Sequence, residues 1–66
     1  MYYLYCNKNK GNRQLLGKFK DEYKLIETAI KEKNNYYRVF GTNADDYIVL
    51  EFIDSKMVFP LCLINA

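Results

Sequence analysis

Three aliphatic hydroxyls and two thiols are the side chains that could perform nucleophilic chemistry in this 66-residue chain. The hydroxyls belong to Ser55, Thr28 and Thr42, and the chain contains no histidine to activate them. Nucleophilic catalysis requires a base within hydrogen-bonding reach of the nucleophile. Cys6 and Cys62 have apolar neighbours in sequence, where cysteine behaves as a small hydrophobic residue. The sequence therefore predicts a protein that is not an enzyme.

Metal and cofactor sites are not expected either. Asp45 and Asp46 are adjacent carboxylates, and hard cations prefer such oxygen ligands. The residues around this pair, however, do not follow the spacing of a calcium-binding loop. Gly11, Gly17 and Gly41 are isolated from one another, so no glycine-rich phosphate loop is present. We expect no bound metal and no cofactor.

Tyrosines and basic residues interleave along the chain and indicate a binding surface. Rings on a sheet can stack on bases while basic side chains neutralise phosphates, so a small nucleic-acid-binding protein is one alternative. It would use a basic hairpin loop and sheet tyrosines. The pI of about 8.5 and the absence of an RNP-type signature oppose it. The residues that we expect to contact a partner are Tyr3, Tyr5, Lys8, Lys10, Arg13, Arg38 and Tyr47.

The charges of the chain are unevenly distributed. Residues 1–20 contain five bases and no acid, whereas residues 21–66 contain five bases and eight acids. The two parts therefore carry +5 and −3, which together give the net charge of +2. This asymmetry indicates either an anionic partner for the basic part or two elements that attract each other within the fold.

Five strands and one helix are expected to position these residues. Short runs rich in aromatic and β-branched residues, bounded by turn residues, predict the strands. The predicted strands span residues 2–6, 14–19, 36–40, 47–53 and 57–63. Pro60 cannot donate to a sheet ladder, which favours an edge position or a bulge for the last strand.

The helix is predicted over residues 22–33. Asp21 suits the N-cap position, and a negative residue follows it in the first turn. Tyr23, Ile26 and Ile30 recur at spacings of three and four, with Leu25 and Ala29 alongside them, which is the pattern of an amphipathic helix. The predicted fold class is therefore α+β, a single domain over residues 1–66 with the order β-β-α-β-β-β and the helix packed on an antiparallel sheet.

One short helix covers only one face of such a sheet, yet both faces carry apolar residues. The set expected to face the helix is Leu4, Cys6, Leu15, Phe19, Ile48, Leu50 and Phe52. The set expected on the opposite face is Tyr3, Tyr5, Leu16, Tyr47, Val49, Ile53 and Val58. Exposed apolar patches of this kind usually mark an interface. The alternative is that tyrosines and β-branched residues simply suit a half-exposed strand surface.

We expect these apolar residues to form the interface of a homodimer. Small domains often need oligomerisation for stability, and two-fold dimers are the commonest oligomers. Only half of the apolar C-terminal strand can face its own helix, which leaves Val58, Cys62 and Ile64 for a partner copy. A Cys6–Cys62 disulfide between the chain ends is the alternative to two reduced thiols.

The chain begins without the pattern of a secretory signal, and its longest apolar run, residues 57–64, is far shorter than the roughly 20 residues of a membrane span. We therefore expect a cytoplasmic protein. The richness in Lys, Asn, Tyr and Ile is typical of AT-rich genomes, and such compact chains resemble small proteins of phages and mobile elements. Many of those bind and block a host protein, including defence enzymes. The predicted function is non-enzymatic binding that blocks or regulates a protein partner.

Overall fold

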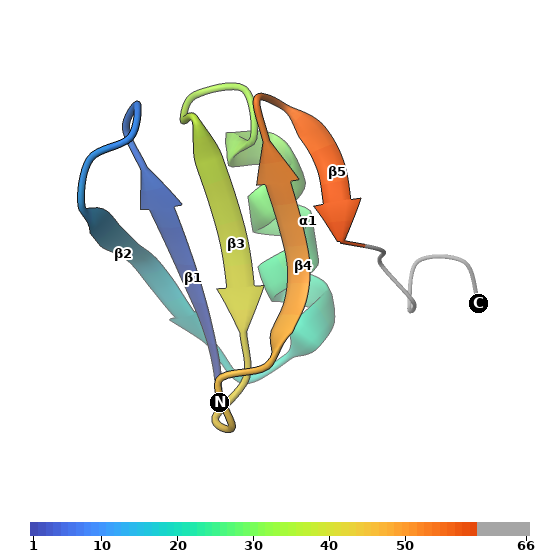
Figure 1. Cartoon of the computed structure of the whole chain (residues 1–66). Helices are drawn as coiled ribbons and strands as arrows, with labels where there is room; N and C mark the ends of the chain where they lie inside the picture. The colour runs from blue at the N-terminus through green and yellow to red at the C-terminus, as the bar shows by residue number, and fades with distance from the viewer. Residues whose placement is uncertain (60–66) are drawn as a thin grey trace.

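Five antiparallel strands form one sheet, and a single helix lies across one of its faces (Figure 1). The structure is a computed structural model that describes residues 1–59. Its elements are β1 (Tyr2–Asn7), β2 (Arg13–Phe19), α1 (Glu22–Glu32), β3 (Arg38–Thr42), β4 (Ile48–Ile53) and β5 (Lys56–Phe59). The strand order is β2-β1-β3-β4-β5, so α1 connects β2 to β3 across β1. The predicted fold class and element order are confirmed.

The helix begins where the sequence predicts. The Asp21 carboxylate accepts a hydrogen bond from the backbone N–H of Tyr23 at 3.0 Å and so caps the first turn. Glu27 and Lys31 form an exposed pair one turn apart at 3.9 Å. The buried face, however, consists of Leu25, Ile26 and Ala29.

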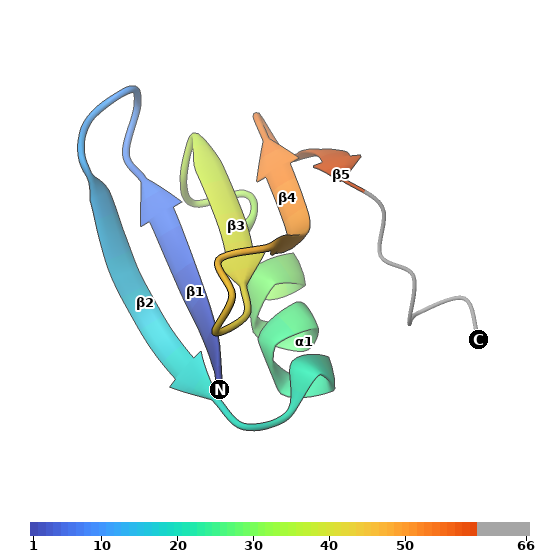
Figure 2. The ribbon, with the colours of Figure 1, turned by 60° about the horizontal axis from the view of Figure 1, so that its bottom comes forward.

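The prediction that Tyr23, Ile26 and Ile30 all lie on the buried face of the helix is therefore partly wrong. Ile30 is 39% exposed, and Tyr23 also lies on the exposed side of the helix. With Ile26 they line a shallow apolar groove of about 250 Å³ on the outer surface of α1. The helix backbone runs closest to β1, β2 and β3, and Figure 2 shows α1 beneath β3, the middle strand of the sheet.

Close approach of the helix to the sheet is centred on Gly41 of β3. A Cβ atom at this position would lie 2.5 Å from Cδ2 of Leu25, which is fully buried. The glycine therefore lets the Leu25 side chain rest directly on the strand backbone. The core that forms around this contact consists of Leu4, Cys6, Leu25, Ile26, Ala29, Val39, Leu50 and Phe52.

The predicted bounds of two strands need correction. β3 spans Arg38–Thr42 rather than residues 36–40, so Gly41 and Thr42 belong to the strand and not to the loop. Glycine usually signals a loop, but here the missing side chain is what allows helix packing. β4 starts at Ile48, which leaves Tyr47 in the preceding loop. The part of the predicted last strand beyond Phe59 lies outside the described residues, as do Cys62 and Ile64.

A β-bulge in β2 reverses the predicted facing of Leu15 and Leu16. Tyr5 pairs with Leu15 and Leu4 pairs with Gly17, so Leu16 is the extra residue between them. Leu16 packs against the core, whereas Leu15 points to the opposite face and is 44% exposed. Because side chains alternate along a strand, one inserted residue exchanges the faces of its neighbours.

The turn between β4 and β5 is fastened to the end of the helix. Asp54 and Ser55 have φ values of 52° and 67°, the backbone signature of a type I′ hairpin turn. The Ser55 hydroxyl donates to the Lys33 carbonyl at 3.1 Å, and Lys33 Nζ donates to the Ser55 carbonyl at 3.4 Å. The backbone N–H of Asp54 donates to the Tyr37 carbonyl at 2.8 Å. These bonds hold β5 at the edge of the sheet.

The Gly41 contact predicts a large effect of a small substitution. Gly41→Ala is expected to lower the free energy of unfolding by about 1–3 kcal/mol, because the enclosed Leu25 side chain has no free space to enter. Urea unfolding followed by circular dichroism measures this loss. Gly17→Ala is the matched control, since its Cβ would lie 3.2 Å from the edge of the half-buried Phe19 ring, which can turn away. Equal unfolding midpoints for both variants would contradict the proposed packing.

Candidate functional site

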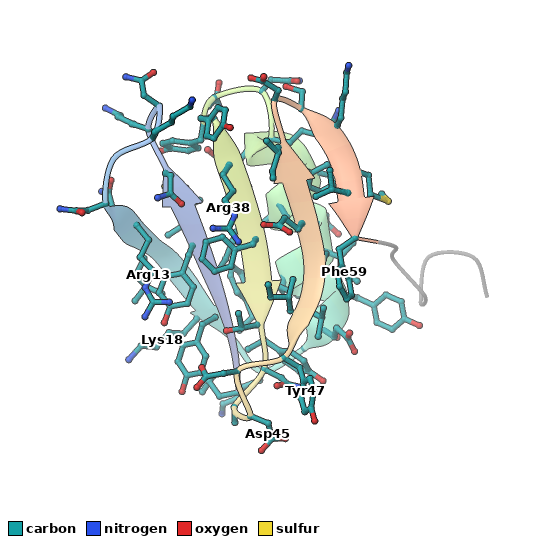
Figure 3. The ribbon with its side chains drawn as sticks, in the orientation of Figure 1. Arg13, Lys18, Arg38, Asp45, Tyr47 and Phe59 are labelled. Atoms are coloured by element: carbon teal, nitrogen blue, oxygen red, sulfur yellow. The ribbon has the colours of Figure 1, made fainter. Side chains whose placement is uncertain are left out.

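The candidate site lies on the sheet face opposite α1, which no other part of residues 1–59 covers (Figure 3). We call it the open face. Strand pairing places one residue of each strand in a row across it. This row consists of Leu15, Tyr5, Phe40, Glu51 and Phe59, in the spatial order of the strands. The open face therefore combines aliphatic, aromatic and charged side chains along one line.

Two arginines and two aromatic rings form the centre of this face, and we call these four residues the Arg–aromatic ladder. The rings of Tyr5 and Phe40 stack with centroids 5.4 Å apart and planes inclined by 26°. The guanidinium carbon of Arg13 lies 4.6 Å from the Tyr5 centroid, and that of Arg38 lies 4.3 Å from the Phe40 centroid. Cation–π contacts of this kind contribute about 0.5–1 kcal/mol each at exposed sites.

The ladder changes what the open face offers to a ligand. Phe40 is only 5% exposed, although it points away from the helix. Tyr5 and Arg38 cover it, and Arg13 lies over Tyr5 in turn. At the ladder, the accessible surface therefore consists of guanidinium groups and ring edges, whereas Phe59, at the far end of the row, is 43% exposed.

The positive charge of Arg38 is neutralised by an ion pair with Glu51. Its Nε donates to Oε1 of Glu51, the neighbouring residue on β4. Asn7 lies between Arg13 and Arg38 in the strand register and donates from Nδ2 to the Gly11 carbonyl at 2.6 Å, which secures the hairpin loop. Among residues 1–59, Arg13 forms no ion pair, so its charge is the free one of the ladder.

The structure brings together four of the seven predicted contact residues. Tyr3, Tyr5, Arg13 and Arg38 all lie on the open face, as the pairing of their strands requires. Lys8 and Lys10 lie in the loop between β1 and β2 at one end of the sheet. They border the open face without belonging to it.

Tyr47 is not part of this group. It lies in the loop between β3 and β4, at the end of the sheet opposite the hairpin loop, and is 71% exposed (Figure 3). Its separation from the hairpin loop follows from the strand order and directions, which local sequence patterns do not specify. Val58 lies on the edge strand β5, and Figure 3 shows its neighbour Phe59 at the side of the sheet far from Arg13.

Sequence reasoning missed three central residues of the open face: Leu15, Phe40 and Glu51. Alternation from Arg38 could have placed Phe40 on the same face as that arginine. The partnership of Arg38 with Glu51 depends on the β3–β4 register, which the sequence did not reveal. Leu15 was hidden by the bulge.

A second hollow lies where the β1–β2 loop, the end of α1 and the β4–β5 turn meet. It has a volume of about 460 Å³ and is lined by Lys8, Asp54, Ser55, two tyrosines and three asparagines. Its lining is polar and holds one residue of each charge. We regard it as a secondary site, since no group of like charges is gathered there.

Cys6 is the one thiol within the described residues, and the structure encloses it. Its side chain lies in the core beneath α1 with no exposed surface. Burial, with a smaller contribution from Glu32, raises the pKa of the Cys6 thiol, while Lys8 lowers it to a lesser extent. The thiolate that would act as a nucleophile is therefore disfavoured.

Burial of Cys6 predicts slow alkylation. As pH rises through the ordinary thiol pKa, the Cys6 thiol ionises in the unfolded chain before it does so in the folded protein. The raised pKa therefore lowers the free energy of unfolding in the alkaline range. In a Cys62→Ser variant, Cys6 should react with iodoacetamide far more slowly in the folded protein than in urea, as measured by mass spectrometry. Labelling of the folded protein at the rate seen in urea would refute the enclosed position.

Neither chemistry nor likeness points to another site. Residues 1–59 contain no cluster of three His, Cys, Asp or Glu side chains that could hold a metal ion. Nor does that part of the chain include a helix long and apolar enough to cross a membrane. Comparison with protein-family models, curated proteins and solved structures gave no match. The open face therefore remains the candidate site of the described residues.

Proposed function

We propose that this chain is a non-enzymatic binding protein that blocks or regulates a protein partner through its open face. The supporting observation is the Arg–aromatic ladder at the centre of an uncovered sheet. Tyrosine and arginine are enriched among the residues that dominate binding energy at protein interfaces. A cytoplasmic inhibitor of a host protein, encoded by a phage or mobile element, is the specific form of this proposal that the composition favours.

The same ladder disfavours nucleic acid as the partner. Bases that stacked on Tyr5 or Phe40 would have to displace the guanidinium groups that already lie over these rings. Single-strand binders also use a groove of unpaired positive charge, whereas Glu51 neutralises Arg38 here. Leu15 and Ile53 add aliphatic surface beside the ladder, which suits a protein partner better.

Affinity capture with a matched pair of variants tests the proposal. Leu15→Asp places a charge on the open face at an exposed position of an edge strand, so it should disturb binding with little loss of stability. The wild-type chain should retain from a bacterial lysate a protein that the Leu15→Asp variant loses. Quantitative mass spectrometry of the captured proteins measures the difference.

Tyr23→Asp is the control, because it changes an equally large exposed side chain on the outer surface of α1. It should retain the same protein as the wild type. Loss of that protein with Tyr23→Asp but not with Leu15→Asp would move the interface to the helix and overturn the proposal. Salt-dependent retention of a short oligonucleotide in place of any protein would favour the nucleic-acid alternative.

A homodimer through β5 is the second part of the proposal. β5 is an edge strand, and Met57, Val58 and Phe59 are 49%, 52% and 43% exposed. Edge strands with exposed backbone groups and apolar side chains are templates for pairing with another chain. The opposite edge, β2, carries two cations, Arg13 and Lys18, which oppose such pairing, whereas β5 carries Lys56 alone. Pairing of β5 with β5 of a second copy would close a two-fold dimer.

Light scattering with Val58→Asp tests the dimer. The wild type should have twice the monomer mass of 7.9 kDa, and Val58→Asp should return it to the monomer, since two like charges would meet near the two-fold axis. Leu15→Asp, on the opposite edge, should leave the dimer intact. A wild-type mass near that of the monomer at high micromolar concentration would end this part of the proposal.

A further inference from the structure

Acids and bases are unevenly distributed among the elements of the described chain. Of the eight acids in the sequence, four lie on α1 or at its cap and three lie in the loops that end β3 and β4. Glu51 is the one acid within the strands of residues 1–59, and Arg38 already pairs with it. The strands contribute Arg13, Lys18, Arg38 and Lys56 as cations. The part of the open face formed by β1 and β2 therefore carries positive charge from Arg13 and Lys18.

Arg13 is held in a position that suits recognition of a carboxylate. Its guanidinium carbon lies 4.6 Å from the centre of the Tyr5 ring, so the ring occupies one face of the group. The N–H donors of guanidinium lie in its plane, and stacking leaves them available at the edge. Among residues 1–59, no carboxylate pairs with Arg13. A planar carboxylate could therefore receive two parallel hydrogen bonds from it.

The neighbours of Arg13 define the rest of the contact. Lys18 pairs in register with Tyr3, and Leu15 pairs with Tyr5, so a second cation and an exposed aliphatic side chain lie on the same side of the sheet. Figure 3 shows Arg13 and Lys18 along β2 at the same margin of the open face. A ligand for this area must combine negative charge with apolar side chains.

We infer that the β1–β2 part of the open face binds an acidic surface of the protein partner, with Arg13 receiving an Asp or Glu carboxylate. The inference rests on the proposed function and names the chemistry of its partner. Charge complementarity carries it, because the cations of this area have no intramolecular partner among residues 1–59. Apolar contact with Leu15 distinguishes such a partner from a uniformly charged polyanion.

Fluorescence anisotropy with defined probes tests this inference. The first probe is a labelled peptide of Glu-Glu-Leu repeats, and the others are a Gln-Gln-Leu peptide of equal length and an oligothymidylate of equal charge. The acidic peptide should bind about tenfold or more tightly than the neutral one, and added salt should weaken its binding. The oligothymidylate should bind more weakly than the acidic peptide.

Substitutions at Arg13 then locate the contact. Arg13→Ala should weaken binding of the acidic peptide about tenfold, and Arg13→Lys should restore only part of it, because lysine keeps the charge but not the planar pair of donors. Lys24→Ala removes an exposed cation from α1 and should leave binding unchanged. Circular dichroism of each variant checks that the fold is intact.

Three outcomes would overturn the inference: equal affinity for the acidic and neutral peptides, no effect of Arg13→Ala, or tighter binding of the oligothymidylate. Failure here is distinct from failure of the proposed function. If Arg13→Ala has no effect while Leu15→Asp still abolishes capture of a protein, the open face binds a partner of other chemistry. If neither variant loses a ligand, both proposals fail.

Discussion

The contact between Leu25 and Gly41 governs this structure. A helix of 11 residues can cover only part of a five-stranded sheet, and the missing side chain of Gly41 determines where it settles. Leu25 rests on the backbone of β3, so Ile26 and Ala29 reach the buried side chains of the neighbouring strands. One close approach therefore fixes which sheet face becomes the core. The other face is left without a second layer, and the candidate site lies there.

The open face is partly covered by its own side chains. Phe40 points away from the helix yet is buried, because Tyr5 stacks on it and the guanidinium of Arg38 lies over it. Glu51 then holds Arg38 in position. This arrangement explains why the strands do not alternate cleanly between apolar and polar residues. The same groups that protect Phe40 present an ordered, cationic and partly apolar surface, which a partner can bind with little loss of side-chain entropy.

The two edges of the sheet differ in kind. Both edge strands contain a bulge, but β2 carries two cations, Arg13 and Lys18, and like charges oppose pairing with another strand. β5 is short, apolar and exposed, and it is held at its start by reciprocal hydrogen bonds between Ser55 and Lys33. Those bonds order an edge strand that the helix itself does not cover. A binding face and a pairing edge can thus occupy separate parts of one small sheet.

Local patterns in the sequence determined the element order and the helix with its Asp21 cap, because these depend on neighbouring residues alone. They also placed Tyr5, Arg13 and Arg38 among the contact residues. Only the tertiary structure decided that Tyr47 lies at the opposite end of the sheet, that Leu15 and not Leu16 faces outward, and that Glu51 pairs with Arg38. Strand order, register and bulges depend on contacts between distant residues, and a single inserted residue exchanges the two faces of a strand.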